Sequence, residues 1–294
     1  MTRVKTRFRI IFGASIALVL ILSLAFKLYA SSTASQLSGV VALVSKGRAI
    51  EPFLETPGTS FVEAHFYLPE GLADDVIFGI DQELIEGVDK PLYIKGGDWM
   101  GLVGLQRNGA VWIAGGTDET MQGKPSRDRA WKIQNLGQPL EPKTWYRMRC
   151  ESDFGKRTFK RLKIDGPGLH KTLMLNDLRL DYPNYMPFDA RSMSYYVFAM
   201  RGRSMMKTRG TPLVYFDDVT GGIERNGKDT VVFQSGFEDQ SIVEKQPISL
   251  PVIKLSNYRQ KHFYLEREES QFRTEKAPFA LSGQFVGVAD VDLH

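Results

Sequence analysis

Cations alternate with apolar residues in two neighbouring segments of the chain. In "KTWYRMRC" the alternation of a strand turns Tyr146, Met148 and Cys150 towards a core and their neighbours away from it. In "FKRLKID" the same rule sends Leu162 and Ile164 inward. If the two strands are neighbours, four cations and one indole share a sheet face: Trp145, Arg147, Arg149, Arg161 and Lys163.

Such a face has two interpretations. Guanidinium forks bind carboxylate or sulfate groups, and an indole packs on a sugar ring, so the residues could hold an anionic polysaccharide. Alternatively, the cations form ion pairs with acids of the chain itself. Residues 51–98 hold eleven acids and two bases, whereas residues 143–209 hold fifteen bases and six acids. Internal compensation is the favoured interpretation, and a basic patch facing an anionic membrane is a third.

In the stretch "TPLVYFDDVTGG", two aspartates directly follow an apolar, strand-like segment. If Val214 and Phe216 face the core, the alternation predicts Asp218 inward and Asp217 outward. A buried carboxylate needs a partner. One candidate is a structural Ca²⁺ with Asp218 as a ligand, and the favoured alternative is that both acids cap the turn that follows. No other cofactor is expected.

Few residues are suited to catalysis. His65 alternates with Glu63 and Tyr67 and would support acid or base chemistry only if that face were a cleft. Cys150 is the one cysteine, so no intramolecular disulfide can form, and its place in a strand predicts a buried thiol. The sequence therefore favours a binding protein over an enzyme.

The dominant apolar period is two, with Gly, Pro, Asn and Asp between the segments. About ten short strands predict an all-β, antiparallel jelly-roll sandwich over residues 50–240. Residues 241–294 form a C-terminal extension that either pairs onto the sandwich or stays loose. The expected strands cover residues 60–68, 76–80, 91–95, 99–106, 110–114, 130–134, 144–151, 158–164, 195–201, 213–219 and 230–234.

The N-terminus predicts export. Four cations precede an uncharged, mostly apolar run from Ile10 to Phe26, so residues 1–30 are expected to be a transmembrane signal anchor or a cleaved signal peptide. Residues 31–49 are expected to be a flexible stalk. Without the five cations of residues 1–30, 33 bases face 34 acids, which argues against a nucleic-acid partner. The expected location is the cell envelope, with the domain extracytoplasmic, or secreted or periplasmic after cleavage.

In that order, "KTWYRMRCESD", "FKRLKIDGPG" and "VYFDDVTGG" resemble the concanavalin A-like lectin/glucanase superfamily and its laminin-G-like relatives. The resemblance spans residues 50–225. It implies a glycan-binding or adhesive module, a glycoside hydrolase or a polysaccharide lyase. The hydrolase pattern Glu-x-Asp-x-x-Glu and the Arg-rich, Gln-x-His and Tyr-x-Lys-x-Gly-x-Tyr strands of the jelly-roll alginate lyases are absent. Catalysis by those routes is therefore not expected.

These observations predict an exported, membrane-tethered module that binds carbohydrate or another cell-envelope polymer. Two alternatives remain open. One is a polysaccharide lyase or glycoside hydrolase with a divergent site. The other is a structural or protein-interaction domain of the envelope.

Overall fold

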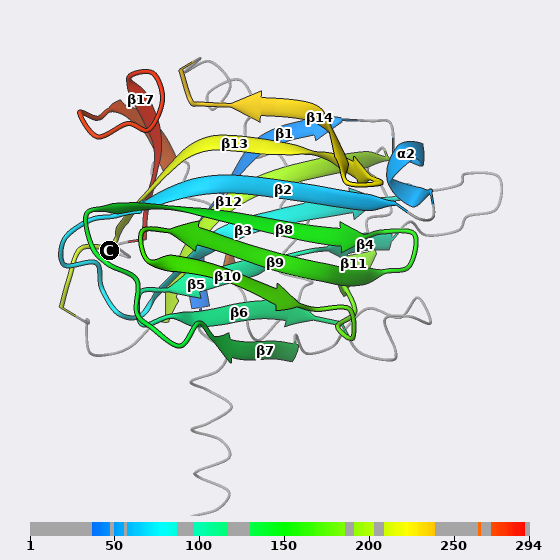
Figure 1. The fold of residues 1–294 in the computed structure, drawn as a ribbon, viewed down its shortest axis with the longest axis horizontal. Helices are drawn as coiled ribbons and strands as arrows, with labels where there is room; N and C mark the ends of the chain where they lie inside the picture. Colours follow the sequence, from blue (N-terminus) through cyan, green and yellow to red (C-terminus); the bar gives the residue numbers. More distant parts are fainter. Residues whose placement is uncertain are drawn as a thin grey trace, which may run out of the picture.

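The structure is a computed structural model, and it describes residues 37–47, 50–55, 58–86, 97–116, 130–185, 191–202, 209–238, 264–265 and 272–291 (Figure 1). The predicted signal segment, residues 1–30, lies outside these ranges. Within them, no helix has the length and apolar character needed to cross a membrane. The one helix described, α2 (Glu51–Leu54), is a single turn.

Two sheets form the described fold, and all strand pairs but β1 with β15 are antiparallel. The nine-stranded sheet has the order β15-β1-β12-β3-β5-β6-β7, with β4 beside β3 and β11 beside β4. Its strands are β1 (Leu37–Gly47), β3 (Val76–Ile85), β4 (Gly97–Met100), β5 (Val103–Gln106), β6 (Ala110–Gly115), β7 (Ala130–Asn135), β11 (Asp181–Tyr185), β12 (Ser192–Gly202) and β15 (Tyr264–Leu265).

The eight-stranded sheet has the order β10-β9-β8-β2-β13-β17-β16, and β14 also pairs with β13. This sheet faces the viewer in Figure 1. Its strands are β2 (Thr59–Leu68), β8 (Thr144–Asp153), β9 (Thr158–Gly166), β10 (Leu169–Met174), β13 (Leu213–Arg225), β14 (Lys228–Ser235), β16 (Phe272–Lys276) and β17 (Phe285–Asp290). The predicted all-β, antiparallel sandwich of two sheets is confirmed.

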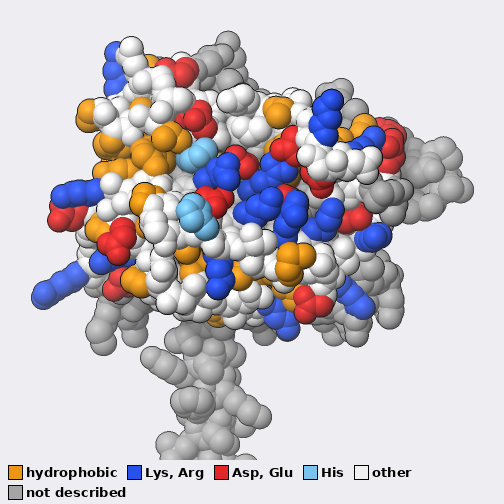
Figure 2. Space-filling view, in the orientation of Figure 1, with side chains coloured by type: hydrophobic (Ala, Val, Ile, Leu, Met, Phe, Trp, Pro, Cys, Tyr) orange, Lys and Arg blue, Asp and Glu red, His pale blue; other side chains and the backbone are white. Residues whose placement is uncertain are grey.

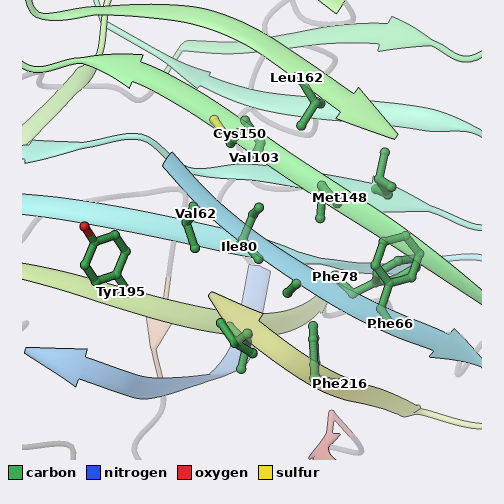
Figure 3. Packing of buried hydrophobic residues seen from close by; sticks show 14 of the residues in the cluster. Val62, Phe66, Phe78, Ile80, Val103, Met148, Cys150, Leu162, Tyr195 and Phe216 are labelled. Carbon is green, nitrogen blue, oxygen red and sulfur yellow. The ribbon is translucent and has the colours of Figure 1, made fainter. Parts of the chain in front are cut away.

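The core lies between the sheets and is built by the alternation read from the sequence (Figure 3). Phe66 of β2 packs against Phe78 of β3, with ring centroids 4.9 Å apart, and Met148 and Leu162 are fully buried beside them. Close packing of such side chains is the main stabilising contribution of a β-sandwich.

One polar network crosses this core. Gln82 of β3 accepts a hydrogen bond from Ser60 Oγ at 2.6 Å and donates one to Ser152 Oγ at 3.1 Å, so both sheets share the amide. Cys150 lies in the same interior, and burial raises the pKa of its thiol to about 12. The predicted buried thiol is confirmed, and a thiolate nucleophile is excluded at neutral pH.

The observed strands extend the predicted ones and add several. Residues 99–106 form two strands, because the chain leaves β4 at Gly101 and enters β5 at Val103. The strand β1 lies inside the predicted stalk, residues 31–49, so strand structure begins before residue 50. The strands β10, β11, β15, β16 and β17 were not predicted. The expected strand at residues 91–95 lies outside the described residues.

The C-terminal extension pairs onto the sandwich. β17 lies against the first half of β13, from Leu213↔Asp290 to Phe216↔Gly287, and β16 pairs with β17. The loop between them, residues 277–284, covers the outer side of β13 and β2. We call β16, β17 and this loop the C-terminal lobe.

Both acids on β13 contact the C-terminal lobe on the outer side of the sheet, so Asp217 points outward as predicted, whereas the predicted inward direction of Asp218 is wrong. Asp217 pairs with His65 and Thr220 with Glu63, so β13 has one residue more than β2 here, and Asp218 has φ +45°. This β-bulge resets the alternation. Asp217 is fully buried beneath the C-terminal lobe, whereas Asp218 is partly exposed.

Asp217 holds the lobe in place. Its carboxylate accepts hydrogen bonds from the backbone N–H groups of Asp218, Leu281 and Ser282 at 2.8, 2.9 and 3.1 Å. Asp218 accepts only the Ser282 hydroxyl, at 2.7 Å, among the described hydrogen bonds. Burial raises the pKa of Asp217, and the three amides offset part of that rise.

We predict that Asp217→Ala costs more stability than Asp218→Ala. Removing the buried carboxylate leaves three amide N–H groups without their acceptor, which costs about 3 kcal/mol, whereas losing the Ser282 hydroxyl contact costs about 1 kcal/mol. Urea unfolding of the two variants and the parent chain measures both. Equal midpoints for the two variants would contradict this role of Asp217.

Candidate functional site

The predicted basic face exists on the outer side of the eight-stranded sheet. β8 and β9 are neighbours, with Arg147↔Asp165, Arg149↔Lys163 and Glu151↔Arg161 opposite one another. Lys and Arg side chains gather over these strands in the middle of the molecular face (Figure 2). The sequence therefore placed all five predicted residues on one face correctly: Trp145, Arg147, Arg149, Arg161 and Lys163.

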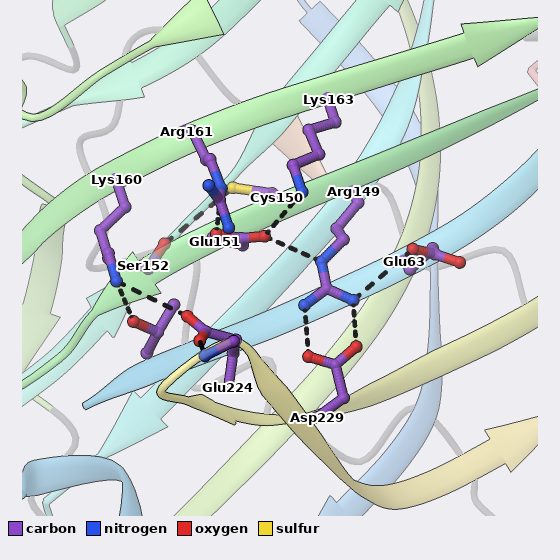
Figure 4. Close-up of polar contacts among 12 residues, drawn as sticks. Glu63, Arg149, Cys150, Glu151, Ser152, Lys160, Arg161, Lys163, Glu224 and Asp229 are labelled. Carbon is purple, nitrogen blue, oxygen red and sulfur yellow. Dashed lines mark hydrogen bonds and ion pairs between the residues drawn. The ribbon is translucent and has the colours of Figure 1, made fainter. Parts of the chain in front are cut away.

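The face is organised around Glu151, which the sequence analysis did not single out (Figure 4). Its side chain is 0% exposed. Arg149 Nε donates to Oε1 at 3.0 Å, Arg161 Nε donates to Oε2, and Lys163 Nζ lies 3.7 Å from Oε1. A carboxylate removed from water needs such partners, because an unpaired buried charge is prohibitively costly. The signal was available, since Glu151 continues the outward alternation of Arg147 and Arg149.

Carboxylates and an aromatic ring surround the guanidinium of Arg149. Its two terminal nitrogens donate to Asp229 at 2.8 and 2.9 Å, Glu63 lies 3.8 Å away, and its guanidinium carbon lies 3.9 Å from the centre of the Phe61 ring. Burial alone would lower the pKa of Arg149, but the hydrogen bonds to Asp229 and Glu151 raise it above its ordinary value. With a 12% exposed side chain, Arg149 is largely engaged in these internal contacts, and its predicted contact with a ligand stays a prediction.

Trp145 contacts the C-terminal lobe, which the sequence did not predict. Its indole N–H donates to the Phe279 carbonyl of the C-terminal lobe at 2.8 Å, and its ring lies 5.4 Å from that of Tyr67. The lobe binds the polar edge of the indole, and the stacking of a sugar on the Trp145 ring stays a prediction. The lobe follows Trp145 in the chain by more than a hundred residues, so no local pattern indicates the contact.

Arg147 is the most exposed of the predicted cations, at 45%. It donates to Asp165 Oδ2 at 2.8 Å and lies 4.0 Å from Glu63. Asp165 also contacts His170 Nδ1 at 3.1 Å. Burial lowers the pKa of the neighbouring His65, so this imidazole is neutral at pH 7 and adds no charge to the face.

Three of the acids on this face lie deeper than three of its cations. The side chains of Glu151, Glu224 and Glu63 are 0%, 14% and 19% exposed, whereas those of Arg161, Lys163 and Lys160 are 35%, 35% and 38% exposed. Above these three acids solvent meets a positive layer first, whereas Asp165 and Asp229 are 31% and 40% exposed and Arg149 is only 12% exposed. In the described part of the chain, five cations contact five acids here: Arg147, Arg149, Lys160, Arg161 and Lys163 against Glu63, Glu151, Asp165, Glu224 and Asp229.

Further buried acids lie on the opposite sheet, two of them on β3. Asp81 and Glu83 of β3 alternate with the inward-facing Gln82, so they face away from the core, and both are buried. The sequence analysis did not single them out. Among the described residues, no group of three or more His, Cys, Asp or Glu side chains is arranged to hold a metal ion. The calcium site with Asp218 as a ligand stays a prediction.

Comparisons with known proteins give a fold likeness only. No family model matches the chain, and no curated protein matches its sequence. Among solved structures, a scytalido-glutamic peptidase with a transition-state analogue inhibitor has a TM-score of 0.32 at 9% identity, covering 87% of this chain and 98% of that one. An alginate lyase from Pseudomonas aeruginosa has a TM-score of 0.26 at 10% identity, covering 62% and 67%.

An alginate lyase from a Chlorella virus has a TM-score of 0.24 at 12% identity, covering 56% of this chain and 84% of that one. These scores are too low to carry a functional argument. The resemblance to the concanavalin A-like superfamily stays a prediction, and the site must be interpreted from its own residues.

We predict that Arg149→Ala destabilises the fold by about 3 kcal/mol, because it leaves buried Glu151 with a weaker set of cations. Arg147→Ala removes an exposed pair and costs less than about 1 kcal/mol. Chemical denaturation of both variants measures the difference. Adding Glu151→Gln to Arg149→Ala should recover part of the loss, and a double variant no more stable than Arg149→Ala would contradict the role of Glu151.

The ionised carboxylate of Asp229 should make the stability of the fold depend on pH in the acid range. The hydrogen bond from Arg149 lowers the pKa of Asp229 below its ordinary value. A lowered carboxyl pKa stabilises the fold above the unfolded-state pKa of about 3.9, and that contribution is lost as the pH falls through the folded-state pKa. We predict that Asp229→Asn makes the loss of stability below about pH 4 shallower, measured by melting temperature against pH.

The control is the same substitution in an Arg149→Ala background. There Asp229→Asn should change the pH profile much less, because the guanidinium that lowers the pKa is gone. An equal change in both backgrounds would show that Arg149 is not the cause.

Proposed function

We propose that this chain is an exported binding module whose basic face, on the outer side of β8 and β9, holds an anionic polysaccharide of the cell envelope. The observation that carries the proposal is the layering of charge. Glu151 lies buried beneath Arg161 and Lys163, which are each 35% exposed, so at this point of the face the two cations lie nearer to solvent than the acid that compensates them.

The individual contacts support a binding role for only some of the cations. Lys163 Nζ lies 3.7 Å from Glu151 Oε1, which is longer than a hydrogen bond. The Lys163 ammonium is therefore only weakly bound to this acid. Arg147 is nearly half exposed although it pairs with Asp165. Carboxylate and sulfate groups are matched acceptors for these donors. Arg149 stays in a supporting role.

The spacing suits a polymer. Arg147 and the Glu151–Arg161 pair are four residues apart along β8, about 13 Å for an antiparallel strand, and the Arg149–Lys163 pair lies between them. The exposed cations therefore follow the strands over about 13 Å. An extended chain that carries an anionic group on successive sugars can meet several of them at once, which raises its affinity through multiple contacts.

A structural role is the second candidate, and the pairing of five cations with five acids favours it. In that case the face would be a self-compensated ion-pair network of the kind that adds little to binding. A location outside the cytoplasm, next to a membrane, is inferred from the N-terminal sequence alone. Direct binding measurements separate the two candidates.

We predict that Arg147→Gln with Lys163→Gln weakens binding of a uronic-acid or sulfated polysaccharide at least about tenfold in the full-length chain. Two exposed charge contacts of this kind contribute on the order of 1.4 kcal/mol together, and the affinity of the parent chain should fall as salt rises. Isothermal titration at two salt concentrations measures both effects.

The matched control is Lys132→Gln with Lys156→Gln, which removes two exposed cations from β7 and from the β8–β9 turn. It lowers the net charge equally and should leave binding near the parent value. Equal weakening by both double variants would indicate non-specific attraction. A parent chain that retains no anionic polysaccharide would favour the structural candidate.

A further inference from the structure

An aromatic cluster adjoins the basic face on the same side of the sheet. Tyr215, Tyr67 and Trp145 lie opposite one another on β13, β2 and β8. Phe279 of the C-terminal lobe stacks on Tyr67 with ring centroids 4.4 Å apart and meets Tyr215 edge to face at 5.0 Å. All four rings stay partly exposed, so the cluster is an aromatic surface and not part of the core.

The lobe fixes the outermost ring of this cluster. Trp145 donates its indole N–H to the Phe279 carbonyl, and Asp217 binds the N–H groups of Leu281 and Ser282 in the same loop. Ala277, at the start of the loop, is buried against β17. Phe279 is thus presented by a loop anchored on both sides, which limits the entropy lost when a ligand contacts the ring.

The aromatic surface and the basic face are continuous. One cross-strand row carries Tyr67 and Trp145, and the next row towards the cations carries His65 and Arg147. Residues two apart on a strand are about 6.8 Å apart, so the two rows are adjacent on the surface. Figure 2 shows hydrophobic side chains gathered on the left of the face, next to the histidines and the central cations.

We infer that Phe279, backed by Tyr67 and Tyr215, forms a sugar-stacking subsite that makes the ligand of the basic face a carbohydrate and not any polyanion. The inference rests on the proposed function. Sugar rings offer an apolar face to an aromatic ring, and the phenol hydroxyls of the two tyrosines can bond to sugar hydroxyls. Burial raises the pKa of Tyr215, so its hydroxyl keeps its proton. The C-terminal lobe thereby becomes part of the binding surface.

The test compares two polyanions on the full-length chain: a hexasaccharide of uronic acids and inorganic polyphosphate of equal charge. The parent chain should bind the hexasaccharide more tightly. Phe279→Leu keeps apolar volume but loses the flat ring, and it should weaken hexasaccharide binding about 3- to 10-fold, as expected of one aromatic contact, while polyphosphate binding changes less than about twofold. Arg147→Gln with Lys163→Gln should weaken both ligands.

Each outcome separates the subsite from the proposed function. Equal affinity of the parent chain for both polyanions, or a Phe279→Leu variant that binds the hexasaccharide like the parent, overturns the subsite and leaves the basic face intact. Binding of neither polyanion overturns the proposed function itself. Binding of anionic lipid vesicles in place of the hexasaccharide overturns the carbohydrate assignment.

A melting curve of Phe279→Leu checks that the C-terminal lobe remains docked on the sheet. If this variant loses the lobe, Tyr215→Leu on the sheet provides the same comparison, with the same expected loss for the hexasaccharide alone. Unchanged hexasaccharide affinity in Tyr215→Leu then overturns the subsite.

Discussion

The buried carboxylate of Glu151 constrains the whole outer face of the eight-stranded sheet. A charge that is fully removed from water must be met by cations, and this requirement brings Arg149 from its own strand and Arg161 and Lys163 from β9. Arg149 in turn fixes Asp229 at the start of β14. The ion pairs thus link strands that are distant in sequence, and losing one cation affects several elements at once.

The sequence predicted this face because alternation is a local property. Tyr146, Met148 and Cys150 are buried and Arg147 and Arg149 face out, as period two requires. The pairing of β8 with β9 was also within reach, since a short turn joins them. The depth of each charge could not be predicted, because the exposure of Glu151 depends on long side chains from a second strand and on the β13–β14 hairpin.

Two departures from the prediction have one physical origin. The bulge at Asp218 adds a residue to β13, so Asp218 faces the lobe and not the core, while Asp217 keeps its expected outward direction. The C-terminal lobe then covers Asp217 and binds Trp145. Both depend on contacts across more than sixty residues of sequence. Strand period cannot indicate a bulge unless the partner strand is known, and a late hairpin gives no local sign of where it docks.

The ion-pair network and the binding surface need not be alternatives. Like charges packed on one face repel each other, and acids buried beneath them remove most of that repulsion without reaching the solvent. Glu151 lets Arg161 and Lys163 stand together at the surface, and Asp165, which is itself 31% exposed, pairs with Arg147. A ligand acid that approaches from solvent meets cations already held in place, so little side-chain entropy is lost on binding. The acids that balance the net charge are therefore the same groups that preorganise the positive layer.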